Sequence, residues 1–98
     1  MEPQQGQIVF STAGHDKGHP FLVMQRTGDF LLLVDGKERK VASPKRKRCK
    51  HTVYGGECRD QAIGTRLGVQ PVLDSEIRRA LAVFREETGG YGAWQKTT

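Results

Sequence analysis

The chain has 98 residues, a formal net charge of +5 and a sequence pI near 9.6, which suits one small basic domain and not two. No apolar run approaches the roughly 20 residues that cross a membrane, and the first residues lack the basic start and apolar run of a secretory signal. Two cysteines do not make a disulfide framework, so we expect a cytoplasmic protein without a membrane anchor.

The first third of the chain predicts three short β-strands separated by turn signals. The expected strands are apolar runs within residues 7–11, 21–25 and 30–34. Between them lie a loop at 12–20, which has two glycines and a proline, and a tight turn at 27–29. Residues 1–6 are polar, and we expect them to be disordered.

Two further strands are expected before residue 54. Asp35-Gly36 is typical of a type I′ hairpin, which would return the chain as a strand at 37–42 until Pro44 ends it. Polar and less polar residues alternate over 48–53, which is typical of a half-buried strand. Five short strands in about fifty residues indicate a mainly β fold, a small five-stranded barrel over residues 7–53.

The second half has a different character. Residues 54–73 are rich in glycine and read as a linker, with a short helical turn near 60–67. A helix is predicted over 74–89, because Ile77, Leu81 and Phe84 share one face. A helix of that length is marginal alone, so its apolar face must dock on the barrel or on a partner, or the helix does not stay folded. Residues 90–98 read as a tail.

The positive charge is concentrated in one segment. Residues 37–51 hold eight Lys or Arg and one Glu, so this segment carries +7, while the remaining 83 residues carry −2. Such a concentration is the electrostatic footprint expected for a polyanionic partner.

Several segments of the first half resemble the KOW family of small RNA-binding barrels. The resemblance rests on 6–11, on the loop 13–18 with Gly14, Lys17 and Gly18, and on 21–24. Val34-Asp35-Gly36-Lys37, Arg39-Lys40, Pro44-Lys45-Arg46-Lys47 and Lys50-His51 make it more specific. These segments look like bacterial KOW proteins similar to eukaryotic and archaeal large-subunit ribosomal proteins with an SH3-like barrel. The resemblance implies such a barrel, RNA binding and a ribosome-associated role in translation.

We therefore predict an RNA-binding protein, with rRNA and the ribosome as the expected partners and a monomer as the expected state. Basic side chains would seat phosphates, and glycine would let the loop backbone approach one. The candidate RNA-binding residues are Lys17, Gly18, Lys37, Arg39, Lys40, Lys45, Arg46, Lys47, Arg48, Lys50 and His51. Three alternatives stay open: a module that binds an acidic protein through the barrel or the helix, a solvated edge strand protected by charge, and a nuclear import signal.

Other chemistries find little support. Cys49, His51 and Cys58, with one of the loop histidines, do not have the paired spacing of a structural zinc site, so we expect no metal and no cofactor. No known catalytic motif occurs, and we do not expect an enzyme. Phe10, Phe21 and Phe30 are expected in the core, and Tyr54 is the better candidate for stacking on a base. Arg78, Arg79 and Arg85 on the helix would extend the RNA footprint.

Overall fold

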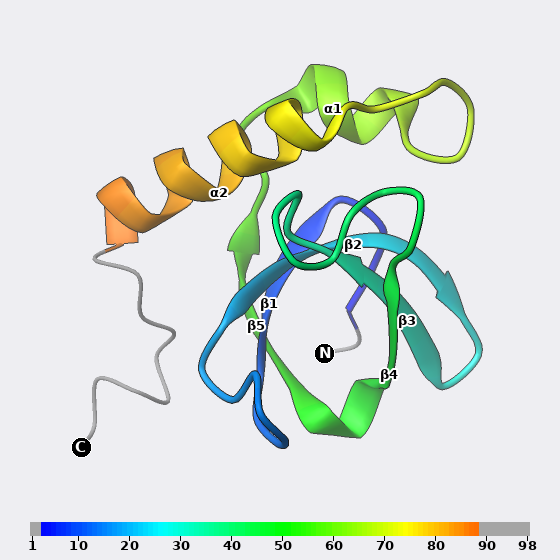
Figure 1. Cartoon of the computed structure of the whole chain (residues 1–98), viewed down its shortest axis with the longest axis vertical. Coiled ribbons are helices and arrows are strands. Elements are labelled where there is room, and N and C mark those ends of the chain that lie inside the picture. The colour runs from blue at the N-terminus through cyan, green and yellow to red at the C-terminus, as the bar shows by residue number, and fades with distance from the viewer. Residues whose placement is uncertain (1–2, 89–98) are drawn as a thin grey trace.

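The computed structural model describes residues 3–88 and has a mainly β fold (Figure 1). One five-stranded antiparallel sheet has the strand order β4-β3-β2-β1-β5. The elements are β1 (Gln7–Ser11), β2 (Pro20–Thr27), β3 (Phe30–Val34), β4 (Lys45–Arg48), the 3₁₀ helix η1 (Cys49–His51), β5 (Thr52–Glu57), α1 (Gln61–Arg66) and α2 (Asp74–Thr88). The sheet curls strongly, and η1 connects its two edge strands, β4 and β5 (Figure 1).

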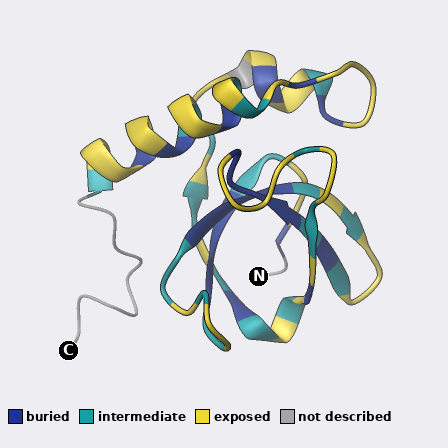
Figure 2. Ribbon diagram, in the orientation of Figure 1, coloured by how far each residue is buried: buried dark blue, intermediate teal, exposed yellow. Residues whose placement is uncertain are grey.

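The central strands are buried on both faces, which explains their continuous apolar runs. Successive side chains of a strand point to opposite faces. In β1, Val9 belongs to an inner cluster inside the curl, whereas Ile8 and Phe10 belong to a second cluster beneath the helices (Figure 2). The other buried strand residues of the inner cluster are Phe21, Val23, Leu31 and Leu33, and those of the helix-side cluster are Leu22 and Val34.

Helix α2 docks on the sheet of its own chain. Its stripe of Ile77, Leu81 and Phe84 is buried in the helix-side cluster, and the Phe84 ring lies 5.8 Å from the ring of Phe10. Figure 2 shows these buried positions along the side of α2 that faces the sheet. The sequence left open whether this helix docks on the barrel, docks on a partner or does not stay folded. The structure shows the first of these arrangements.

The stretch predicted as a linker contains two elements. Residues 54–57 continue β5, where Gly55 is the extra residue opposite the step between Ile8 and Val9. A Cβ atom on Gly55 would lie 2.8 Å from the Phe10 ring, so glycine lets the strand pass beneath that side chain. Helix α1 falls within 60–67, where a helical turn was predicted.

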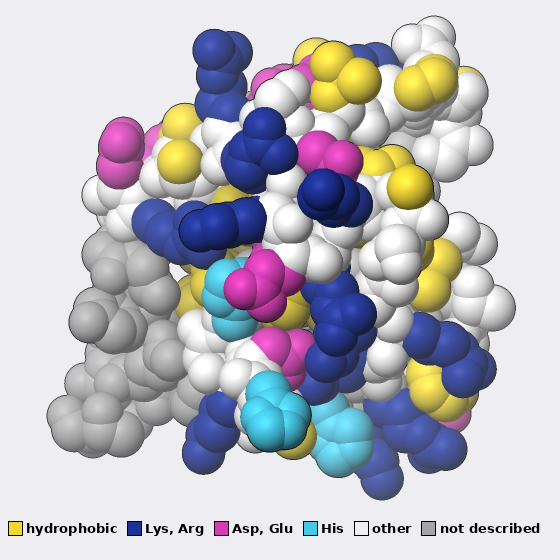
Figure 3. Space-filling model, in the orientation of Figure 1, with side chains coloured by type: hydrophobic (Ala, Val, Ile, Leu, Met, Phe, Trp, Pro, Cys, Tyr) yellow, Lys and Arg dark blue, Asp and Glu magenta, His cyan; other side chains and the backbone are white. Residues whose placement is uncertain are grey.

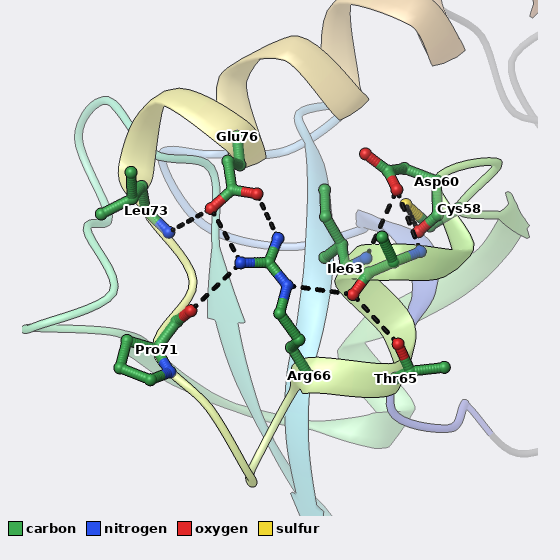
Figure 4. Close-up of polar contacts among 9 residues, drawn as sticks. Cys58, Asp60, Ile63, Thr65, Arg66, Pro71, Leu73 and Glu76 are labelled. Atoms are coloured by element: carbon green, nitrogen blue, oxygen red, sulfur yellow. Dashed lines mark hydrogen bonds and ion pairs between the residues drawn. The ribbon is translucent and has the colours of Figure 1, made fainter.

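Side-chain contacts join α1 to the start of α2 (Figure 4). The Asp60 carboxylate caps α1 by accepting from the amides of Ala62 and Ile63. The Arg66 guanidinium forms an ion pair with Glu76 of α2, and Glu76 in turn accepts from the Leu73 amide at 3.0 Å. These contacts hold the 67–73 connection against both helices.

The predicted strand at 37–42 is wrong. Residues 35–43 form a loop, and the fourth strand begins at Lys45. The buried Asp35 carboxylate closes this loop by accepting from the amides of Lys37 at 2.9 Å and Arg39 at 2.8 Å. Gly36, at φ +75°, serves a close approach to α2, because a Cβ atom there would lie 2.3 Å from the carbonyl oxygen of Asp74.

The single strand predicted over 48–53 is also wrong in detail. The 3₁₀ helix η1 interrupts it, so β4 ends at Arg48 and β5 starts at Thr52. At the N-terminus, Pro3 is buried, and the Gly6 amide donates to the Val23 carbonyl at 2.9 Å, although we predicted disorder over 1–6. Residues 1–2, Gly89 at the predicted helix end, and the predicted tail at 90–98 lie outside the described residues.

Candidate nucleic-acid interface

The fold divides the basic segment among three neighbouring structures. Lys37, Arg39 and Lys40 are exposed on the loop 35–43. Four cations follow on the edge strand β4, and Lys50 and His51 lie on η1. Figure 3 shows Lys and Arg side chains spread over this face of the molecule, with a few acidic and histidine side chains among them.

Alternation along β4 separates its four cations into two pairs with different surroundings. Lys45 and Lys47 turn toward the loop 12–19, where Asp16 meets both ammonium groups. Arg46 and Arg48 point away from that loop into solvent. The strand period of two, and not the charge itself, decides which side chains a ligand can reach.

The two lysines of β4 anchor the loop. Lys45 Nζ lies 2.8 Å from Asp16 Oδ2, and Lys47 Nζ lies 3.1 Å from Asp16 Oδ1. The side chain of Lys47 is only 9% exposed, and its ammonium also donates to the Ala13 carbonyl at 2.9 Å. These contacts hold the ammonium of Lys47 inside the protein, where a phosphate cannot reach it without displacing Asp16.

Asp16 is the negative centre of this anchor. Burial by itself raises the pKa of the Asp16 carboxyl, but Lys45, the Ser11 hydroxyl and Lys47 together hold that pKa well below its usual range. The Ser11 hydroxyl donates to Asp16 Oδ1 at 2.7 Å. Asp16 is therefore ionised at neutral pH, and it neutralises part of the positive charge that the sequence places on β4.

Arg46 and Arg48 form an open cationic pair over an aromatic ring. Their guanidinium carbons lie 3.5 Å and 5.1 Å from the centre of the Phe30 ring. Both arginines are exposed, and within residues 3–88 neither has an acidic partner. The ring supports two planar, permanently charged groups that suit phosphates and base faces.

Phe30 thus departs from its predicted place. The core prediction is confirmed for Phe10 and Phe21, which are fully buried, but Phe30 is only half-buried and belongs to neither cluster. It pairs with Arg48 across β3 and β4. The sequence alone does not distinguish an apolar strand residue in the core from one beneath surface arginines.

The loop 12–19 offers less backbone to a ligand than the sequence suggests. The Gly18 amide donates to the Ser11 carbonyl at 2.7 Å, and the Lys17 amide donates to the Gly14 carbonyl at 3.3 Å. These N–H groups are already paired inside the loop. Of the two loop residues predicted to bind RNA, Lys17 still offers its exposed side chain to a phosphate.

His19 connects this loop to the loop 35–43. Its Nε2 atom lies 2.9 Å from Asp35 Oδ2, and the Asp35 side chain is 5% exposed. Burial by itself raises the pKa of Asp35, but hydrogen bonds from the Arg39 and Lys37 amides and from His19 bring that pKa below its ordinary value. The contact joins two loops that both carry candidate residues.

A hollow of about 610 Å³ opens between these loops and α2. Lys17, Arg39 and Lys45 line it together with Arg85 of α2. The sequence analysis named Arg85 as an extension of the footprint, and this hollow brings it beside the loop cations. Arg78 is used otherwise, because its Nη1 atom donates to the Gly36 carbonyl at 2.6 Å.

A second groove, of about 660 Å³, lies between the two edge strands. Arg48 of β4, Lys50 of η1 and Tyr54 of β5 line it. The Tyr54 side chain is 38% exposed, and its hydroxyl donates to Glu57 at 2.5 Å. That hydrogen bond raises the pKa of Tyr54. The sequence pattern does not indicate that these residues share a groove, because it predicted one continuous strand over residues 48–53, where the structure has η1.

His51, the last candidate, contacts the loop 12–19 through its backbone, because its carbonyl accepts from the Thr12 amide at 2.9 Å.

Two other kinds of site and the sequence comparisons remain to be considered. In the described part of the chain, no three His, Cys, Asp or Glu side chains converge to hold a metal ion, and neither helix combines the length and apolarity needed to cross a membrane. Comparison of the sequence with models of protein families and with curated proteins finds no match.

Proposed function

We propose that this protein binds RNA through the exposed cations around β4. The observation that carries the proposal is the pair Arg46 and Arg48, which is exposed, free of acidic partners within 3–88, and stacked on Phe30. Lys50 continues this surface on η1, and the loop 35–43 adds exposed cations next to it. Phosphates would bind the guanidinium groups, and RNA shape would be matched by the loops on either side.

The proposal includes the family and the setting. We propose that the curled sheet is an SH3-like barrel of the KOW type. We also propose that the protein is a cytoplasmic monomer that binds rRNA on the ribosome. The antiparallel order, with β5 beside β1 and η1 joining the two edges, supports a barrel. The segments that resemble the KOW family correspond to β1, the loop 12–19, β2 and the β3–β4 region.

The structure bears on two alternative interpretations, a charge-protected edge strand and an acidic protein partner. β4 is an edge of the sheet, as a strand merely protected by charge would be. That interpretation does not require two arginines on one aromatic ring. An acidic protein partner would have to use the same cations, because the apolar stripe of α2 is buried against its own sheet.

The proposal is tested by RNA affinity as a function of salt. We expect Arg46→Gln/Arg48→Gln to weaken binding to structured RNA and to make the log–log salt slope less negative by about 1.4–1.8, because each lost phosphate contact accounts for about 0.7–0.9. Arg59→Gln is the control, since it removes one positive charge from an exposed position outside this surface, where the Arg59 guanidinium pairs with Glu87 at 2.9 Å. Thermal melts establish that both proteins fold.

A salt-independent affinity, or a loss of affinity per removed charge that is as large in Arg59→Gln as in Arg46→Gln/Arg48→Gln, contradicts the proposal. Ribosome sedimentation from cells tests the setting. Co-sedimentation that survives nuclease treatment would favour a protein partner over RNA.

A further inference from the structure

We infer that the groove between β4 and β5 holds one unpaired nucleobase of the bound RNA, stacked on Tyr54. This inference rests on the proposed RNA binding and adds a preference for RNA with an unstacked nucleotide over a continuous duplex.

The groove exists because the sheet does not close. β4 and β5 are the two edges in the strand order, and η1 spans the gap between them (Figure 1). Cys49 of η1 lines the groove and also packs on the inner cluster, so the groove lies next to the apolar interior of the curl. The volume of about 660 Å³ is within the roughly 300–1,000 Å³ of small-ligand sites.

The side chains of the groove suit a base more than a bare phosphate. Tyr54 offers a partly exposed ring whose hydroxyl is fixed by Glu57 at 2.5 Å, so the ring is oriented before a ligand arrives. Val53 and Cys49 add apolar or weakly polar contacts. Asp29 also lines the groove, and its carboxylate disfavours an anion there but accepts hydrogen bonds from exocyclic amino groups.

Two cations lie where the backbone of such a nucleotide would pass. Arg48 and Lys50 are both exposed and both line the groove. Arg48 also belongs to the pair on Phe30, so one side chain connects the phosphate surface to the groove. A strand of RNA held by β4 can therefore place a base into the groove without leaving the cationic surface. Aromatic stacking with a cationic border is the usual way in which proteins hold an unstacked base.

The test uses a hairpin RNA with a single 2-aminopurine bulge, and the same hairpin with 2-aminopurine paired to uridine. With the full chain, we expect quenching of 2-aminopurine fluorescence and tighter binding for the bulged hairpin only. Tyr54→Ala should abolish the quenching and weaken binding of the bulged hairpin about 5- to 150-fold, the effect of losing one base–aromatic stack. Tyr54→Phe, which keeps the ring and loses only its hydrogen bond to Glu57, should retain the quenching and lose much less affinity than Tyr54→Ala.

Tyr54→Leu guards against a folding defect, because it fills the space without an aromatic face and should reproduce the Ala result. Equal affinity and equal quenching for both hairpins, or quenching that persists in Tyr54→Ala, would overturn the inference while salt-dependent RNA binding remained. Failure of the natural chain to bind either hairpin at low salt would instead refute both the inference and the proposed function. A parallel titration with adenosine monophosphate separates the sources of the base: saturation as tight as that by the bulged hairpin would point to a free nucleotide, and much weaker binding supports RNA.

Discussion

We predict that the ion pairs between Asp16 and the two lysines of β4 contribute strongly to the free energy of unfolding. Asp16→Asn removes the negative charge that faces Lys45 and Lys47, at distances of 2.8 and 3.1 Å. Lys47 is then left as a buried ammonium, 9% exposed, with the Ala13 carbonyl as its neutral acceptor. An uncompensated buried charge of this kind typically costs about 3–5 kcal/mol.

The lower end of that range is expected here. Lys45 is 24% exposed and can regain water when its partner is lost, and the Asn side chain still accepts a hydrogen bond. A loss of about 3 kcal/mol corresponds to a melting temperature lower by roughly 12–24 °C for a domain of this size. Thermal and urea unfolding, followed by circular dichroism, measure it.

Two further variants decide whether charge is the cause. Asp29→Asn makes the same change of net charge at an exposed turn and should alter stability by less than about 0.5 kcal/mol. Adding Lys47→Met to Asp16→Asn removes the orphaned ammonium and should restore much of the loss, because an apolar pair can replace a buried ion pair. If Asp16→Asn is no worse than Asp29→Asn, or if Lys47→Met destabilises it further, the reasoning is refuted.

Two other predictions concern pH and the approach of α2. The pKa values of Asp16 and Asp35 are lowered in the folded state, so the contribution of these carboxylates to stability is complete above about pH 5 and is lost as the pH falls toward the folded-state values. Asp16→Asn should therefore lose less stability between pH 5 and 2 than the natural chain does, as measured by urea titrations at several pH values. Gly36→Ala should cost clearly more than Gly28→Ala in the same unfolding assay. Both glycines have positive φ, but only at Gly36 does the new Cβ atom meet backbone, 2.3 Å from Asp74 O, whereas Gly28 faces open space; equal costs would contradict the packing argument.

The pattern of apolar residues predicted most of the elements because it reflects burial directly. The strands at 7–11 and 30–34 and the helix from residue 74 are found where they were expected. The element at 37–42 failed for a reason that lies elsewhere in the chain. Asp35-Gly36 is a local hairpin signal, but here Gly36 is needed because the backbone of α2, almost forty residues later in the chain, packs directly against it.

The candidate site shows the same division. The concentration of charge at 37–51 is readable from the sequence. The strand at 45–48, whose alternation sorts the cations of β4, was not predicted, because the expected strands were 37–42 and 48–53. The role of Asp16 was missed, since an acidic residue in a glycine-rich loop has the signature of a turn residue. Its partners are 29 and 31 positions away, and only the β4 edge beside that loop brings them together.

By itself, the sequence determined a mainly β chain with one strongly basic segment and one amphipathic helix whose apolar face needs a surface to pack on, because composition and periodicity record burial and charge residue by residue. The tertiary structure decided which cations stay free. It paired Lys45 and Lys47 with Asp16, set Arg46 and Arg48 on Phe30, and left a groove beside Tyr54 where the sheet edges do not meet. These features depend on contacts between residues far apart in the chain, which no local pattern encodes.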